Sequence, residues 1–241
     1  MAQPAEPLGP DRVTVAIVAE SAAIADRVAD RLTTRRRVDS GSLSVVVGDL
    51  RGVVVAVATP KSPASDWGQV VRSLRAAHRP AVLIAAGLVT PNEEGQPAAG
   101  PVRFAAAVDR DRICYRLPTD TADQVWVVAH PQTQTNQADA RADWPAAIAA
   151  VCAEFDLPLA MFAAVDTAGS AGAEWRSLTR QPSAAGKLGA ALAGVWRRPA
   201  FAKEAATRFA QRWKQLDQLV DRIEQFAGAA QGRVPGAPRR D

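Results

Sequence analysis

One stretch of the chain, residues 145–167, constrains the fold most, because in it a helix of small residues leads directly into a buried strand (PAAIAAVCAEFDLPLAMFAAVDT). Pro145 suits the first turn of a helix, where its missing N–H has no partner in any case. An apolar stripe at helical spacing follows, made by Ile148, Val151, Cys152 and Phe155. Residues 157–165 carry almost no polarity, which predicts a strand covered on both faces. Asp166 and Thr167 then supply the first polar side chains, at the strand end where open α/β sheets bind ligands.

Strand and helix patterns alternate along the rest of the chain, which is typical of a layered α/β domain. The expected strands are 13–18, 43–58 (a hairpin turning at Arg51-Gly52), 81–86, 102–108, 112–115 and 125–129. The other expected helices are 22–32, 66–77 and 200–227, the second capped by Ser65 or Asp66. We therefore expect an α/β fold, a three-layer single domain with a mixed central sheet flanked by helices. The domain should span 13–227, with residues 1–12 and the Gly/Pro-rich tail 228–241 disordered.

Five segments occur in an order and at spacings that together point to one family. They are VAIV (15–18), VVVGDLRGVVVAVAT (45–59), RPAVLIAAGL (79–88), the helix-to-strand unit described above, and LGAALAGVWRRPAFAKEA (188–205). This series resembles the nucleoside phosphorylase and nucleosidase superfamily, most closely the bacterial 5′-methylthioadenosine/S-adenosylhomocysteine nucleosidases. The resemblance implies a phosphorylase/hydrolase-like fold, a purine nucleoside as ligand, and no cofactor or metal.

The resemblance also implies three catalytic carboxyl groups. Cleavage of a purine N-glycosidic bond needs one group to protonate the base, one to activate water and one to hold the ribose hydroxyls. At each family position this chain has a residue without a carboxyl group, and an acidic residue lies one to four positions earlier. The three pairs, in the order water, ribose and base, are Ile24 with Glu20, Trp144 with Asp143, and Thr167 with Asp166.

The loop that approaches the nucleoside in the family corresponds to Gly87, where Leu88-Val89 replace small polar residues and would fill the space a ligand needs. The resemblance places Ile24, Trp144 and Phe162 at the same substrate site. We therefore expect a catalytically degenerate nucleosidase-fold protein, acting as a binding or interaction module in nucleoside-related metabolism. The alternative is an active purine-nucleoside hydrolase or phosphorylase that uses Asp143 and Asp166, with Glu20 as the substitute water-activating group.

Charge and composition narrow the class of partner. The net charge of +4 suggests nucleic acid at first sight, but the cations are scattered, and the densest run, Arg35 to Arg37, is expected to be the solvated end of the helix 22–32. The chain has no apolar run long enough for a membrane span and no basic leader, so we expect a cytoplasmic protein. Its two cysteines have no metal-ligand spacing.

The C-terminal helix carries apolar residues at alternating spacings of four and three. These are Phe209, Trp213, Leu216, Val220, Ile223 and Ala227. Such a heptad seam could contact a partner, either a second copy or a paralogue, or it could pack on the protein's own sheet.

Overall fold

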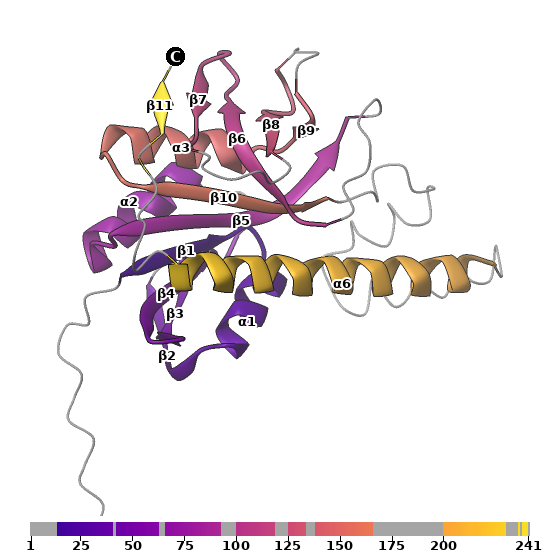
Figure 1. Ribbon diagram of the computed structural model, residues 1–241, viewed down its shortest axis with the longest axis horizontal. Helices are drawn as coiled ribbons and strands as arrows, with labels where there is room; N and C mark the ends of the chain where they lie inside the picture. The colour runs from indigo at the N-terminus through magenta and orange to yellow at the C-terminus, as the bar shows by residue number, and fades with distance from the viewer. Residues whose placement is uncertain are drawn as a thin grey trace, which may run out of the picture.

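The computed structural model describes residues 14–40, 42–62, 66–92, 100–118, 125–133, 138–165, 200–229, 236 and 238–240. In these residues one mixed, 11-stranded sheet lies between two layers of helices (Figure 1). The expected α/β fold with a mixed central sheet flanked by helices is confirmed.

Four parallel strands form the centre of the sheet: β4 (Val53–Pro60), β1 (Val15–Ala19), β5 (Val82–Pro91) and β10 (Leu159–Val165), in that spatial order. Every residue of β1 and β10 is buried. Burial on both faces explains why these strands are continuous apolar runs in the sequence rather than alternating ones.

Antiparallel strands extend the sheet on both sides of this centre. β3 (Leu43–Leu50) pairs with β4, and β2 (Thr33–Ser40) pairs with β3 at one edge. On the other side β6 (Val102–Val108) runs antiparallel to β10. In space β6 lies between β7 (Cys114–Arg116) and β8 (Val125–Ala129). The two-residue strands β11 (Arg239–Arg240) and β9 (Ala140–Arg141) pair with β7 and β8, respectively.

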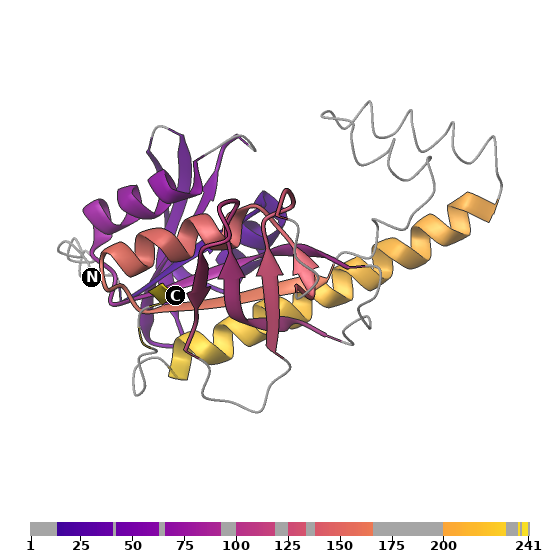
Figure 2. The same ribbon diagram turned by 90° about the horizontal axis from the view of Figure 1, so that it is seen from above.

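The helices divide the core into two apolar clusters, one on each face of the sheet. On one face lie α2 (Trp67–His78) and α3 (Trp144–Glu154), and on the other lie α1 (Ala22–Asp30) and α6 (Ala200–Ala229). Figure 2 shows that α6 runs along its face of the sheet and that its N-terminal part extends beyond the strands. The predicted hairpin is confirmed: Arg51 and Gly52 adopt positive φ angles of 54° and 83°, as a tight turn between β3 and β4 requires.

The start of α2 is fixed by Asp66. Its Oδ1 accepts hydrogen bonds from the backbone N–H groups of Gly68 (2.9 Å) and Gln69 (3.3 Å). Of the two residues expected to cap this helix, Ser65 and Asp66, the cap is therefore Asp66. We predict that Asp66→Ala lowers the free energy of unfolding by about 1 kcal/mol, because two backbone donors lose their acceptor. Urea denaturation measures this, and Asp66→Asn, which keeps an acceptor oxygen, should recover most of the loss.

The arginine run lies on a strand, and part of the C-terminal tail pairs with the sheet. Helix α1 ends at Asp30, and Arg35, Arg36 and Arg37 lie on the edge strand β2, so the expectation of a helix end was wrong, although their side chains are exposed. Residues 1–12 lie outside the described residues, and of the tail, Arg239 and Arg240 form β11 against β7.

Candidate functional site

The candidate site lies at the carboxyl ends of the neighbouring parallel strands β1 and β5. Glu20 directly follows β1, and its backbone N–H donates to the carbonyl oxygen of Ala86, at 2.8 Å. Its half-buried carboxylate accepts from the backbone N–H of Leu88, with Oε2 at 2.5 Å from the nitrogen. The structure therefore puts one carboxylate beside the Gly87-Leu88 segment.

Trp144, the first residue of α3, covers this segment from one face. Its side chain is only 1% exposed, and its Nε1–H donates to the carbonyl oxygen of Leu88, at 3.3 Å. A Cβ atom placed on Gly87 would lie 2.6 Å from the indole ring, and Phe104 packs against the same ring, with ring centroids 5.6 Å apart. The indole thus fills the space directly above the backbone of Gly87.

Ile24 and Phe162 lie on the opposite face of the sheet. Ile24 is fully buried, Phe162 is 1% exposed, and both belong to the apolar cluster beneath α1 and α6. The side chain of Leu88 packs against the same cluster, while its backbone meets Trp144 and Glu20. Leu88 therefore has its backbone beside Trp144 and Glu20 and its side chain against the cluster that contains Ile24 and Phe162, so Ile24 and Trp144 lie on different faces of the sheet.

The two aspartates have different settings. Asp143 is exposed at the N-cap position of α3, where its side chain makes no capping hydrogen bond. Asp166, like Thr167 and most of the segment 188–205, lies outside the described residues. Of the three acidic candidates, the structure therefore places two. Glu20 lies at the end of β1, and Asp143 lies at the end of the β9–α3 connection.

Other reactive groups are few in the described part of the chain. No group of three or more His, Cys, Asp or Glu residues could hold a metal ion among the residues described. Burial raises the pKa of the Cys152 thiol to about 12, so this thiol stays protonated near neutral pH and is a core residue rather than a nucleophile. Within the described residues, no helix is long and apolar enough to cross a membrane.

The sequence analysis did not single out Arg103, a charged residue of the core. Arg103, on β6, is only 5% exposed and stands next to Phe162 across the β6–β10 pairing. Its signal in the sequence is a single cation inside an otherwise apolar strand (VRFAAAV).

Comparison with solved structures identifies the class of fold. The sequence matches no protein-family model, and no curated protein matches it. The structure nevertheless has the nucleosidase fold, which confirms the resemblance to the superfamily at the level of the fold.

Three solved structures illustrate the similarity. The 5′-methylthioadenosine/S-adenosylhomocysteine nucleosidase of Colwellia psychrerythraea 34H, in complex with adenine, aligns at a TM-score of 0.54 and 11% identity, over 64% of this chain and 83% of that one. Helicobacter pylori MTAN aligns at a TM-score of 0.55 and 11% identity, over 73% and 95%. A futalosine hydrolase mutant of Helicobacter pylori strain 26695 aligns at a TM-score of 0.53 and 11% identity, over 63% and 84%.

Proposed function

We propose that this protein is a catalytically degenerate member of the nucleosidase fold, acting as a binding or interaction module in nucleoside-related metabolism. The observation that carries the proposal is the contact between Trp144 and Gly87. The sequence resemblance puts the ribose-binding carboxylate at Trp144 and the nucleoside-facing loop at Gly87. An indole in contact with that glycine takes the place of both the carboxylate and the ligand, which supports a loss of N-glycosidase activity.

The setting of Ile24 adds independent support. The resemblance puts the water-activating carboxylate at this position, and Ile24 is fully buried among apolar side chains of α1, α6 and the sheet. A hydrocarbon side chain can neither orient nor deprotonate a water molecule. Glu20, the acidic residue four positions earlier, directs one carboxylate oxygen to the backbone of Leu88 instead.

A second candidate function is an active purine-nucleoside hydrolase or phosphorylase. Glu20 favours it, because its carboxylate lies at the end of β1 beside the Gly87-Leu88 segment, close to where the family's nucleoside would bind. In this reading Asp166 protonates the base, Asp143 holds the ribose, and Glu20 activates water. The exposed side chain of Asp143, without a capping partner, is compatible with that role.

Base release distinguishes the two functions. The purified protein is incubated with methylthioadenosine, S-adenosylhomocysteine, adenosine or inosine, with and without phosphate, and free adenine or hypoxanthine is measured. Each missing carboxyl group should cost about a hundredfold or more in rate, so we predict release near the uncatalysed background. An active nucleosidase of the same fold serves as the positive control.

The same assay on Asp143→Asn and Asp166→Asn tests the second function. Release at an ordinary enzymatic rate by the unmodified protein, abolished by either substitution, would overturn the proposal and give the aspartates catalytic roles. If release is absent, a thermal shift with one of the nucleosides would favour a retained ligand-binding role. An unchanged melting temperature would favour the interaction role.

A further inference from the structure

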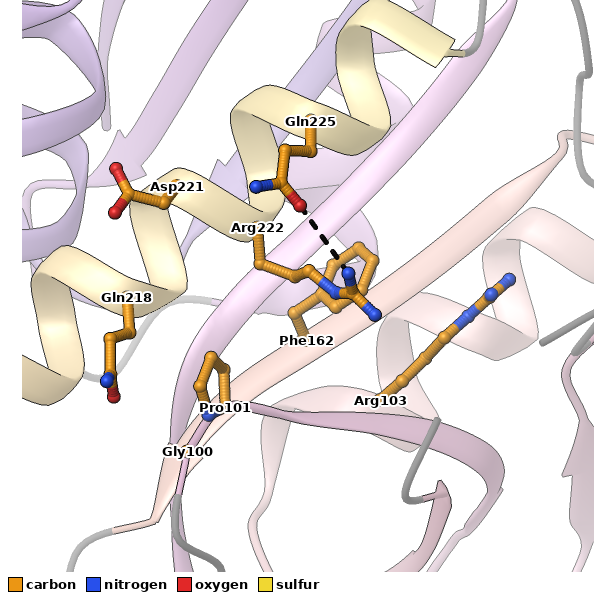
Figure 3. A pocket seen from close by; sticks show the side chains of 8 residues that line it. All are labelled: Gly100, Pro101, Arg103, Phe162, Gln218, Asp221, Arg222 and Gln225. Atoms are coloured by element: carbon orange, nitrogen blue, oxygen red, sulfur yellow. Dashed lines mark hydrogen bonds between the residues drawn. The ribbon is translucent and has the colours of Figure 1, made fainter. Parts of the chain in front are cut away.

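A pocket of about 330 Å³ opens between the C-terminal half of α6 and the strands β6 and β10 (Figure 3). It lies on the α6 face of the sheet, opposite the face that Trp144 covers. Its lining residues are Gly100, Pro101, Arg103, Phe162, Gln218, Asp221, Arg222 and Gln225. This volume is at the lower end of the range for small-molecule sites, so it suits a ligand of a few heavy atoms.

Two arginines from different elements line this pocket. Arg103 comes from β6; its Nη2 donates to the carbonyl oxygen of Pro118, at 3.0 Å, and its guanidinium carbon lies 5.4 Å from the ring centroid of Phe226. These contacts hold a nearly buried cation in one orientation. Arg222 comes from α6, and its Nη1 donates to Oε1 of Gln225 at 3.5 Å (Figure 3).

Asp221, the acidic residue among the described lining residues, pairs with an arginine that does not line the pocket. Asp221 accepts a hydrogen bond from Nη2 of Arg31 on α1, with Oδ1 at 3.1 Å. In Figure 3 its carboxylate points away from both Arg222 and Arg103. Among the described lining residues the cations Arg103 and Arg222 thus outnumber the one acid, and the amide groups of Gln218 and Gln225 add further hydrogen-bonding capacity.

We infer that this pocket binds a small oxyanion, either a phosphate group or a carboxylate, through Arg222 and Arg103. A guanidinium presents paired N–H donors whose spacing matches the oxygens of such anions, and a partly desolvated setting strengthens the contact. Phe162 and Pro101 provide an apolar wall for the group that carries the anion. This inference does not depend on the proposed loss of hydrolysis, since the pocket and the Gly87-Leu88 segment have different linings.

Isothermal titration at constant ionic strength tests the site with three probes: inorganic phosphate, ribose 5-phosphate and succinate. The key variant is Arg222→Gln, and the matched control is Lys214→Gln, which removes one positive charge from an exposed position of the same helix, outside the pocket. We expect Arg222→Gln to weaken binding by about tenfold or more, the loss typical of a charged hydrogen-bonding partner. Lys214→Gln should stay within about twofold of the unmodified protein.

The probes distinguish the two sources of the anion. Binding of inorganic phosphate and ribose 5-phosphate without succinate assigns the site to phosphate groups, and tighter binding of succinate assigns it to carboxylates. Arg103→Gln should weaken the same probe, provided circular dichroism shows that the variant is folded. The absence of binding by every probe at 10 mM, or equal losses for Arg222→Gln and Lys214→Gln, would overturn the inference.

Discussion

Trp144→Ala should lower the free energy of unfolding by about 3 to 5 kcal/mol, the cost of removing a fully buried aromatic side chain from a close-packed site. The indole is 1% exposed, contacts Gly87 and Phe104, and donates a hydrogen bond to Leu88. Alanine replaces all of these contacts with a cavity, and the carbonyl of Leu88 loses a donor. Urea denaturation followed by far-ultraviolet circular dichroism measures the loss.

Gly87→Ala tests the same contact from the other side. An added Cβ would lie 2.6 Å from the indole, so Trp144 or the strand must move, at a cost of about 1 to 3 kcal/mol. Gly52 is the one glycine with a positive φ angle among the residues described, so the conformation of Gly87 itself accommodates alanine. In a Trp144→Ala background the added methyl group should therefore cost at least about 1 kcal/mol less. Equal costs in both backgrounds would show that the indole does not determine the choice of glycine.

This contact also bears on function, because the ring that stabilises the domain occupies the space above the loop. A protein that hydrolyses nucleosides needs that space open, with a carboxylate in it. If the proposed function is right, the indole that stabilises the domain by filling this space also excludes a ribose from it. The proposal thus assigns stability and loss of catalysis to the same contact.

The central strands could be predicted from the sequence because burial on both faces leaves a clear signal. Residues 157–165 have no polar side chains, and they contain the parallel strand β10. The hairpin at Arg51-Gly52 was predictable for a local reason, since the turn needs two residues with positive φ.

The edge strand β2 could not be predicted in the same way. Its sequence, TTRRRVDS, has no alternation of polar and apolar residues, and the side chains of residues 33–38 are exposed. It is a strand because β3 offers it backbone partners, and arginines at such an edge discourage pairing with other chains. Local pattern carries no information about a partner strand that becomes available only when the sheet forms.

The candidate site was predictable only in part. The family resemblance suggested that Gly87 and Trp144 belong to one site, but it does not reveal that an indole lies on a glycine 57 positions earlier in the chain. Strand register decides this, because Gly87 faces the α3 layer whereas its neighbour Leu88 faces the α6 layer. The role of Arg103 likewise depends on the pairing of β6 with β10.

The second prediction with a large expected effect on stability concerns helix α6. Of its heptad seam, Leu216, Val220, Ile223 and Ala227 are buried against the sheet and α1. Trp213 is 50% exposed and contacts the guanidinium of Arg27, 4.0 Å from the ring centroid, while Phe209 lies outside the residues whose side chains are described. The C-terminal part of the seam thus packs on the protein's own domain.

Ionic contacts orient the same part of the helix. Glu224, which is 8% exposed, accepts hydrogen bonds from Arg51 of the β3–β4 turn (2.6 Å) and from Arg31 at the end of α1 (3.4 Å). Asp217 pairs with Arg27, and Asp221 with Arg31. Because these partners belong to the same chain, they fix which face of α6 meets the sheet.

We therefore predict that Ile223→Ala lowers the free energy of unfolding by about 2 to 5 kcal/mol, because a fully buried side chain leaves a cavity beneath the helix. Trp213→Ala removes a larger side chain from the same seam but should cost less than about 1.5 kcal/mol, since half of that side chain is already in water and its cation–π contact is exposed. Urea denaturation at two protein concentrations tenfold apart measures both variants. Packing of the seam on its own sheet requires losses that are independent of concentration. A loss for Ile223→Ala that grows on dilution, together with a smaller mass by light scattering, would instead show that the seam is held by a second chain.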